Sequence, residues 1–402
     1  MSPFRAATSF AFSELTSFPN RHSHWRNRHK RLTLRTTGLI SDQSIHSKDF
    51  SSGQTGVHCD FVNPLQDPQW NEKILEREDA TFFHSAEWAR VLVEAYGYEP
   101  QYAVFSDAGR TVGILPIMEV RSLWTGNRGI SLPFSDECPP LLASGVKLPG
   151  LVEPLRAHGM ERGWSYLEFR GGGEMLPAAA VCNEFAFHHL RLDEDEDGQF
   201  RRMREANRRN IRKGIREGVQ VERLYTRGAM DVFYRLHCET RRLHGLPPQP
   251  AGFFHLIHKH VIEKGHGFVS LARHEQRWIA GAVFFEFGES AMYKFGASDR
   301  HFQHLRANNL VMWDAICYFQ RKQFRELSLG RSRLNNEGLM RFKRSWGAEE
   351  TSVKYHQIGL QKKVKVPYYE RSETAAWLPK VTQWIPLPVL RLIGRLAYRH
   401  IA

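Results

Sequence analysis

The clearest pattern in the chain runs from residue 291 to residue 347. It opens with AMYKFGA, in which apolar residues occupy every second position, the period of a strand with one exposed face. Four segments follow this strand. In order, they are a polar turn, the helical pattern NNLVMWDAICYF, the short apolar run LSLG, and the cationic and aromatic segment NNEGLMRFKRSWG. The pattern predicts a strand, a helix, a buried strand and a last segment, with a functional cleft between the first strand, the start of the helix and the Phe342-Lys343 pair.

The helix in this stretch has a recognisable start. Asn308 and Asn309 are good N-cap residues, because an asparagine side chain accepts a hydrogen bond from a backbone amide of the first turn. We therefore expect the helix to begin at one of them. Helical spacing predicts its buried face, which consists of Leu310, Trp313, Ile316 and Cys317.

A unit of helix and hairpin occurs twice in the chain. In each copy an amphipathic helix precedes a hairpin whose four-residue turn ends in arginine. The helices span 84–96 and 252–263, and the turns span 107–110 and 274–277. The same elements in the same order indicate an internal duplication. The sequence therefore predicts two domains with one plan.

This plan divides the chain into four regions. We expect a basic N-terminal extension at 1–55, a first domain at 56–189, a second domain at 190–359 and an amphipathic tail at 360–402. The extension lacks periodicity, so it is a disordered tail or the product of a wrongly assigned start codon, although its arginines also fit a transit peptide. The predicted fold class is α/β (α+β), with a mixed, mostly antiparallel sheet flanked by helices in each domain.

Composition narrows the class of partner and the compartment. The 402 residues carry a net charge of +13, which favours a nucleic acid, a phosphorylated substrate or an anionic membrane surface as partner. The five cysteines are scattered and form no Cys-x-x-Cys pair, which argues against a disulfide framework or a thiolate zinc site. No apolar run is long enough to span a membrane. We expect a cytoplasmic protein, with peripheral contact at the inner face of the membrane as an option.

Two basic segments are candidates for contact with an acidic partner. Arginine and lysine are dense at 201–216, which is either a solvated helix face or an electrostatic guide for a polyanion. In the tail, Arg391, Arg395 and Arg399 share one face of a helix, which either lies on an anionic membrane or, as we favour, packs on the first domain. The apolar face of the tail helix comprises Val389, Leu392, Ile393 and Leu396.

Several of these segments resemble known acyltransferases. The strand around Gly281, the strand YKFGASD and the helix NNLVMWDAI resemble the core of the GNAT superfamily. The chain also resembles FemAB-like (FemA/FemB/FemX) proteins with a BioF2-like acetyltransferase domain, in its duplicated layout and in the segments NRRNIRKG and GLMRFKRSWG. This group is often associated with exosortase and exopolysaccharide systems. The resemblance extends from about Val57 to Gly359. It implies two tandem GNAT-like domains and transfer of an aminoacyl or acyl group to an amine.

The resemblance also implies residue roles, with one departure. In FemX-like enzymes the donor is an aminoacyl-tRNA, the acceptor is a peptidoglycan precursor, and the lysine of a Phe-Lys pair lies beside the reacting carbonyl; that pair matches Phe342-Lys343. The GNAT pyrophosphate loop, Gln/Arg-x-x-Gly-x-Gly/Ala, is not found, because residues 301–309 contain no glycine. Backbone amides at 308–311 can still meet an anion at the helix start, but the departure disfavours ordinary acetyl-CoA binding.

Acyl transfer to an amine requires an electrophilic carbonyl, a neutral amine and stabilisation of the oxyanion. Lys343 is the candidate for the oxyanion role, Asp299 for accepting or holding the amine proton, and Tyr293 for protonating a leaving group. Each candidate has a structural alternative. These alternatives are a surface lysine, a turn-forming aspartate and a core tyrosine.

Substrate contacts are predicted at the end of one helix and along the cleft. Arg241, Arg242 and His244 either clamp a phosphate or carboxylate or stabilise the C-terminus of their helix. The histidines at 255–260 and 301–304 lack a carboxylate at ligand spacing, so we expect no metal site and no bound cofactor. The predicted substrate contacts along the cleft are Lys294, Asn308, Asn309, Phe342 and Trp346.

Three functions remain open from the sequence. The first is transfer of an aminoacyl or acyl group, from aminoacyl-tRNA or acyl-CoA, to an amino group of a phosphorylated or lipid-linked cell-envelope precursor of peptidoglycan or exopolysaccharide. The second is acyl-CoA-dependent N-acylation of an amino sugar. The third is a non-catalytic protein that associates with nucleic acid or membrane. The absent glycine loop favours the first over the second, and the Phe-Lys segment favours either over the third.

Overall fold

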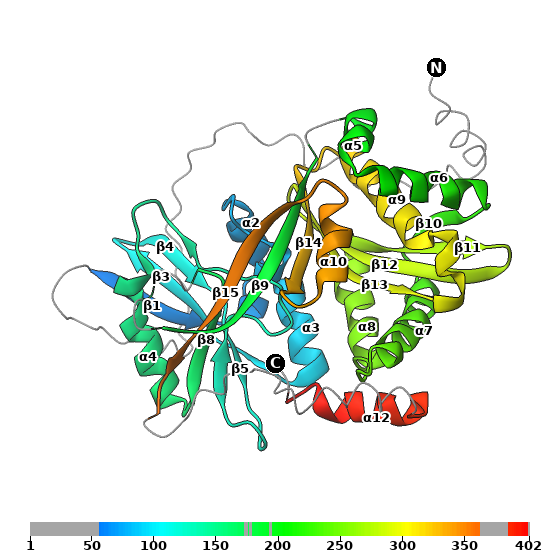
Figure 1. Ribbon diagram of the computed structural model, residues 1–402. Coiled ribbons are helices and arrows are strands. Elements are labelled where there is room, and N and C mark those ends of the chain that lie inside the picture. The colour runs from blue at the N-terminus through cyan, green and yellow to red at the C-terminus, as the bar shows by residue number, and fades with distance from the viewer. Residues whose placement is uncertain (1–55, 173–175, 177–178, 193–194, 362–384, 401–402) are drawn as a thin grey trace. The chain divides into compact units, whose positions relative to one another are not determined.

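The computed structural model describes most of the two predicted domains (Figure 1). The predicted extension at 1–55 and part of the predicted tail lie outside the described residues. The structure describes residues 56–400 apart from 173–175, 177–178, 193–194 and 362–384.

The first half of the chain builds a small antiparallel sheet with the order β1-β3-β4-β7. β3 and β4 form the predicted hairpin, with Asp107 paired to Arg110. Helix α3 begins after Ser85, whose Oγ accepts a hydrogen bond from Trp88 N at 3.2 Å, and ends at Gly97 in the left-handed conformation. The elements are β1 (Val57–Val62), β3 (Tyr102–Asp107), β4 (Arg110–Leu115), β7 (Leu141–Leu142), α2 (Trp70–Leu75), α3 (Ala86–Tyr96) and α4 (Val152–Glu161).

A sheet of eleven strands runs through both halves of the chain. Strand β9 from the first half pairs with β14, and β15 from the second half is inserted between β9 and β8. The two halves therefore share one set of hydrogen bonds, and the predicted boundary at residue 189 falls within β9. In sheet order the strands are β10 (Gln220–Leu224), β11 (Gly267–His274), β12 (Arg277–Phe287), β13 (Ser290–Ser298), β14 (Glu326–Arg333), β9 (Ala180–Arg191), β15 (Glu349–Gly359), β8 (Tyr166–Arg170), β6 (Arg128–Ile130), β5 (Met118–Val120) and β2 (Glu99–Pro100).

Helices cover both faces of the second half of this sheet (Figure 1). α9 and α6 lie on one face, and α7 and α8 lie on the other. No helix among the described residues has both the length and the apolar character needed to cross a membrane. The helices are α5 (Glu196–Arg202), α6 (Glu205–Arg216), α7 (Arg227–Leu243), α8 (Ala251–Ile257) with a π-helical turn (His258–Ile262), α9 (Ala307–Arg321), α10 (Glu337–Arg344) and α12 (Leu387–Ala397).

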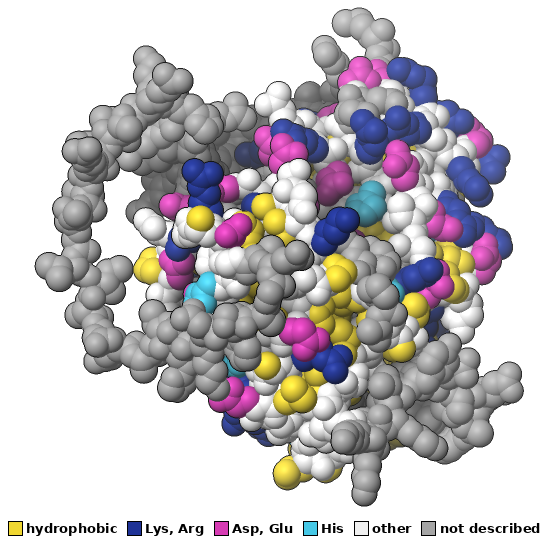
Figure 2. All heavy atoms as spheres, turned by 90° about the vertical axis from the view of Figure 1, so that its left-hand side faces the viewer, with side chains coloured by type: hydrophobic (Ala, Val, Ile, Leu, Met, Phe, Trp, Pro, Cys, Tyr) yellow, Lys and Arg dark blue, Asp and Glu magenta, His cyan; other side chains and the backbone are white. Residues whose placement is uncertain are grey.

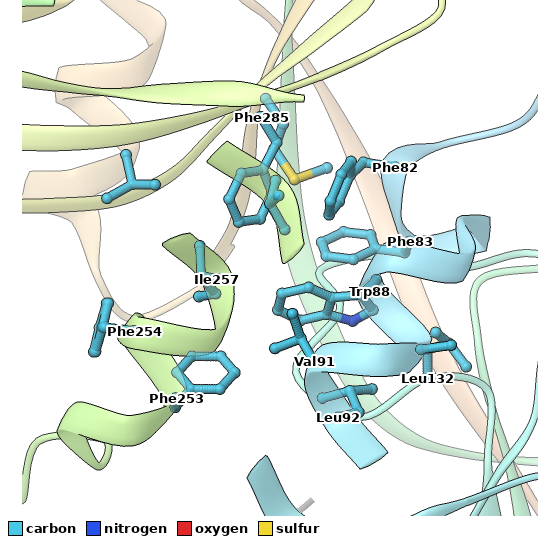
Figure 3. Packing of buried hydrophobic residues seen from close by; sticks show 14 of the residues in the cluster. Phe82, Phe83, Trp88, Val91, Leu92, Leu132, Phe253, Phe254, Ile257 and Phe285 are labelled. Carbon is cyan, nitrogen blue, oxygen red and sulfur yellow. The ribbon is translucent and has the colours of Figure 1, made fainter. Parts of the chain in front are cut away.

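Strand β12 separates two hydrophobic cores because its side chains alternate between the faces. Val283 and Phe285 belong to the core under α3 and α8, whereas Ala282 and Phe284 belong to the core under α9. Figure 3 shows side chains of α3 and α8 pointing toward one another next to Phe285. The first core therefore joins the two halves of the chain.

The predicted fold class is confirmed, since mixed, mostly antiparallel sheets are flanked by helices. The predicted strand at 291–297 is β13, and the second predicted hairpin is β11–β12. The predicted start of α9 is wrong. Arg306 precedes the helix in the left-handed conformation, with φ +61°, and Asn309 lies inside the first turn, where its Nδ2 donates to Asn207 Oδ1 at 3.1 Å. That buried tertiary hydrogen bond replaces the expected cap.

Candidate active site

A pocket opens where β13 ends and α9 begins. It has a volume of about 170 Å³ and lies between the end of the strand, the 3₁₀ turn Arg300–Leu305, the first turn of α9 and one residue of α10. Its walls include four predicted site residues, Asp299, Asn308, Asn309 and Phe342. The structure thus has a pocket at the place where the sequence predicts a cleft.

Asp299 holds the turn that forms one wall of this pocket. One carboxylate oxygen accepts a hydrogen bond from His301 N at 3.0 Å, and the other accepts one from Arg277 Nη2 at 2.9 Å. Both oxygens are therefore engaged in capping the 3₁₀ turn and in an ion pair. This arrangement agrees with the alternative of a turn-forming aspartate, and the role of Asp299 as a proton acceptor stays a prediction.

Helix α10 carries two neighbouring residues to different surroundings. Phe342 lines the pocket. The Lys343 side chain is buried, and its Nζ donates to the carbonyl oxygens of Gly330 at 2.8 Å and Arg331 at 3.0 Å near the end of β14. Lysine has three N–H donors, and these two bonds fix the position of the ammonium group.

Lys343 is one of three cations that lie near the carboxylate of Asp136. Lys294 Nζ lies 3.0 Å from Asp136 Oδ2 and also donates to Phe134 O at 2.7 Å. Arg331 Nε lies 3.8 Å from Asp136 Oδ1, and 30% of the Arg331 side chain is exposed, so the group reaches solvent. We call these residues the Asp136 cluster: Asp136, Lys294, Arg331 and Lys343. Their surplus of positive charge favours an anionic ligand or a developing oxyanion.

Burial and charge shift the pKa values in the Asp136 cluster. Burial lowers the pKa of Lys343 to about 8, and repulsion from Arg331 and Lys294 adds to this effect, while Asp136 opposes it. Burial also lowers the pKa of Lys294, although the carboxylate of Asp136 offsets part of that change. Burial alone would raise the pKa of the Asp136 carboxyl. The positive charges of Lys294 and Arg331 have the larger effect, and the pKa of this carboxyl is therefore lowered. Asp136 therefore stays ionised, whereas Lys343 is close to its titration range near neutral pH.

The loop that carries Asp136 has a strained backbone. Leu132 and Phe134 adopt left-handed conformations, with φ of +53° and +59°, which cost energy for residues with a branched or aromatic side chain. Side chains from the large sheet hold the loop: Arg170 Nη1 donates to Leu132 O at 3.1 Å, and Tyr355 Oη donates to Asp136 O at 2.7 Å. Such strain, held by neighbouring strands, is typical of functional sites.

Of two other predicted site residues, one is buried in the core and the other is partly buried against it. Trp346 is fully buried under α9, which corrects the expectation that it contacts a substrate. The Tyr293 ring covers Gly296, where an added Cβ would meet its Oη at 1.7 Å, and burial raises the pKa of Tyr293 to about 12. These facts agree with the alternative of a tyrosine packed against the core, and the role of Tyr293 as a proton donor stays a prediction.

The cations at the end of α7 have structural partners. Arg241 Nη2 donates to Tyr398 Oη at 2.7 Å, and Arg242 Nη2 donates to Glu239 at 2.6 Å. His244 is the C-cap of α7 and is exposed. The contacts of Arg241 and Arg242 agree with the structural alternative rather than a substrate clamp. Within the part of the chain that the structure describes, no three His, Cys, Asp or Glu side chains gather as in a metal site.

The sequence analysis missed three residues of this site, Asp136, Arg331 and Tyr355. Asp136 lies in a proline-rich loop of the first half, 158 residues before its partner Lys294. The only local signal is a pair of acidic residues, Asp136 and Glu137, in the stretch SLPFSDECPP. Its place beside two lysines follows from the pairing of β9 with β14, which no local pattern specifies.

Comparisons with known proteins identify one domain of the chain and the overall fold. Residues 201–344 match the model of the acetyltransferase (GNAT) domain Acetyltransf_6. The structure of FemX has a TM-score of 0.58 at 12% identity, over 74% of this chain and 96% of that one. The match shows that the chain contains a GNAT acetyltransferase domain, and the similarity to FemX shows the fold. The second domain of the chain is of the acyltransferase type, which disfavours the non-catalytic alternative.

Two further solved structures share this fold. A tandem GNAT protein from the clavulanic acid biosynthesis pathway has a TM-score of 0.51 at 12% identity, over 77% of this chain and 100% of that one. A conserved protein of unknown function from Bacteroides thetaiotaomicron VPI-5482 has a TM-score of 0.52 at 10% identity, over 79% of this chain and 100% of that one. At these identities the similarity shows the fold. No curated protein sequence matches the chain significantly.

The structure changes the interpretation of the missing glycine loop. In the GNAT motif the first glycine stands three residues after Gln or Arg, and counted from Gln303 that position is Arg306. Arg306 adopts the left-handed conformation for which glycine is the usual residue, and both residues line the pocket. The backbone turn is therefore formed without glycine, and the missing glycine no longer argues against an anionic donor at this helix start.

Proposed function

We propose that this protein transfers an aminoacyl or acyl group to an amino group of an anionic cell-envelope precursor, a phosphorylated or lipid-linked sugar of peptidoglycan or exopolysaccharide. The observation that carries the proposal is the position of Lys343. Its ammonium group is held by two carbonyls within the Asp136 cluster, and the adjacent residue, Phe342, lines the pocket at the start of α9.

The chemistry assigns a role to each part of the site. The amine of the acceptor attacks the acyl carbonyl, a C–N bond forms, and negative charge develops on the carbonyl oxygen. The third N–H of Lys343 stabilises that oxyanion in a site of low polarity. The C–O bond to a tRNA ribose, or the C–S bond of a thioester, then breaks, and the amine proton leaves to solvent or to the leaving group.

The Asp136 cluster is the proposed contact for the acceptor. Lys294, Arg331 and Lys343 together outnumber the one carboxylate, and Arg331 is the partly exposed member. A guanidinium binds phosphate or carboxylate oxygens in a bidentate manner, so Arg331 is suited to the first contact with an acidic precursor. Asp136 keeps the lysines fixed while the acceptor binds.

A second candidate, acyl-CoA-dependent N-acylation of an amino sugar, is favoured by the conformation of Arg306. The left-handed residue before α9 forms a turn at a helix N-terminus, where phosphate oxygens bind backbone amides well. The pocket at this turn is the proposed donor site under either function. The two candidates differ in the acceptor, and the second requires coenzyme A as the carrier of the acyl group.

Binding and transfer measured on the same chain separate these candidates. We expect saturable binding of aminoacyl-tRNA in competition with its deacylated form; strong binding of acyl-CoA alone would select the second candidate. Lys343→Met keeps the length of the side chain and removes the charge, so transfer should fall by about 10²–10³-fold. Lys354→Met, at an exposed position on β15, is the matched control. Unchanged transfer by the folded Lys343→Met variant would refute the proposed site.

A further inference from the structure

Helix α12 presents an apolar stripe to solvent. Val389, Leu392, Ile393 and Leu396 are 46%, 55%, 41% and 55% exposed. Their spacing of three and four residues places them on one face of the helix. Large side chains gathered on a surface in this way mark an interaction site more often than single exposed ones do.

The opposite face of α12 is firmly docked, so the orientation of the stripe is fixed. Gly394 packs so closely that an added Cβ would lie 2.0 Å from Pro248 O. Tyr398 Oη accepts from Arg241 at 2.7 Å and donates to Pro247 O at 3.1 Å. The tail helix thus packs on Arg241, Pro247 and Pro248 of the predicted second domain and leaves its apolar face outside, whereas the sequence favoured packing on the first domain.

A second apolar element lies beside the end of α12. Leu123 and Trp124, at the tip of the turn between β5 and β6, are 100% and 70% exposed. The Trp124 ring lies 4.3 Å from the His400 ring, and Arg128 Nη2 donates to His400 O at 2.8 Å. Figure 1 places α12 and β5 in the lower part of the molecule, and Figure 2 shows hydrophobic side chains reaching the surface at its lower edge. We call these six residues the apolar face: Leu123, Trp124, Val389, Leu392, Ile393 and Leu396.

The charged residues of the tail helix beside the apolar face are all positive. The segment from Ile385 to His400 contains Arg391, Arg395 and Arg399 and no acidic residue, and Arg395 and Arg399 are exposed. A nucleic acid would match these cations but would gain nothing from six exposed apolar side chains. The headgroup region of an anionic bilayer accepts cations, an exposed tryptophan and a shallow apolar helix face together.

We propose that the apolar face docks this protein on an anionic lipid bilayer, with α12 in the plane of the interface and Leu123-Trp124 inserted beside it. The inference rests on the two exposed elements and their charges, and it does not depend on the proposed acyl transfer. Should both hold, the protein would meet a lipid-linked acceptor by diffusion along a surface rather than through solution. The affinity would depend on salt, because the arginines attract the surface charge.

Vesicle flotation with the full chain tests the proposal. Wild type should float with vesicles of phosphatidylglycerol and phosphatidylcholine and far less with phosphatidylcholine alone. Leu392→Ser/Ile393→Ser removes two side chains that are each about half exposed, so binding should weaken roughly 10–30-fold. Leu123→Ser/Trp124→Ser should weaken it by a similar factor. The control is Leu75→Ser/Val181→Ser, which removes two equally exposed side chains elsewhere and should change nothing.

Several outcomes would overturn the proposal. Wild type that does not float with anionic vesicles would refute docking of the apolar face on a bilayer. Equal flotation of the wild type and both apolar-face variants would assign binding to another segment, such as residues 1–55. If wild type dimerises in sedimentation experiments, does not float, and Leu392→Ser/Ile393→Ser makes it monomeric, the occupant is a second copy of the chain. Circular dichroism of each variant checks that the fold is retained.

Discussion

The depressed pKa of Lys343 gives a prediction that needs no substrate. Its ammonium group is desolvated in the folded state, where its pKa is about 8, against an ordinary value of 10.5 in the unfolded chain. Between these two values the unfolded state binds more protons than the folded state. Wild type therefore gains stability as the pH rises through this window, because unfolding then requires uptake of a proton.

The magnitude follows from the two pKa values. At 1.36 kcal/mol for each pH unit, the interval from about 8 to 10.5 corresponds to about 3 kcal/mol. The free energy of unfolding of wild type minus that of Lys343→Met should therefore rise by about 3 kcal/mol between roughly pH 7.5 and pH 10.5. Taking the difference between two proteins removes the titration of the groups that do not interact with Lys343.

Urea denaturation at a series of pH values measures this difference. Lys354→Met should follow wild type throughout, because that side chain is exposed on β15. A difference between wild type and Lys343→Met that stays constant within about 0.5 kcal/mol would refute the reasoning, since a lysine that titrates alike in both states makes no pH-dependent contribution. The Lys343 ammonium would then be solvated, and its proposed oxyanion role would lose its low-polarity setting.

Three other perturbations test separate parts of the structure. Asp136→Asn leaves the buried Lys294 without its carboxylate, so we expect a loss of about 3–5 kcal/mol in denaturation, largely recovered when Lys294→Met is added; a loss below about 1 kcal/mol would contradict the cluster. Arg306→Gly should stabilise the protein by about 1 kcal/mol because of the left-handed backbone, whereas Arg306→Ala should not; equal effects would argue against that conformation. Gly394→Ala should displace α12 from Pro248, seen as faster amide exchange in residues 387–397; unchanged exchange would mean that the close approach is absent.

Local patterns were sufficient to predict most of the elements. The period of two at 291–297 gave β13, and polar turns at 107–110 and 274–277 gave the two hairpins. These features depend on residues that are neighbours in sequence, so the physics that forms them is visible in a short window. The exposed stripe of α12 was visible for the same reason, although its docking through Gly394 was not.

Local patterns failed where a distant contact overrides a local preference. Asn308 and Asn309 favour a helix cap in isolation, but Asn309 instead bonds Asn207, and Arg306 takes the strained position before α9. Trp346 resembled a ligand contact because it follows the Phe342-Lys343 pair, yet its position after α10 turns it into the core. Neither outcome can be read from the residues adjacent in sequence.

The amino-acid sequence by itself determined the types of element, their order and the cationic segment that ends in the Phe342-Lys343 pair. Only the tertiary structure decided which groups meet. Inserting β15 between β9 and β8 places the loop of Asp136 next to Lys294 and Arg331, and burial there shifts the pKa of Lys343. Periodicity fixes which face of an element is apolar, but strand pairing across the chain fixes which charges are forced together away from water.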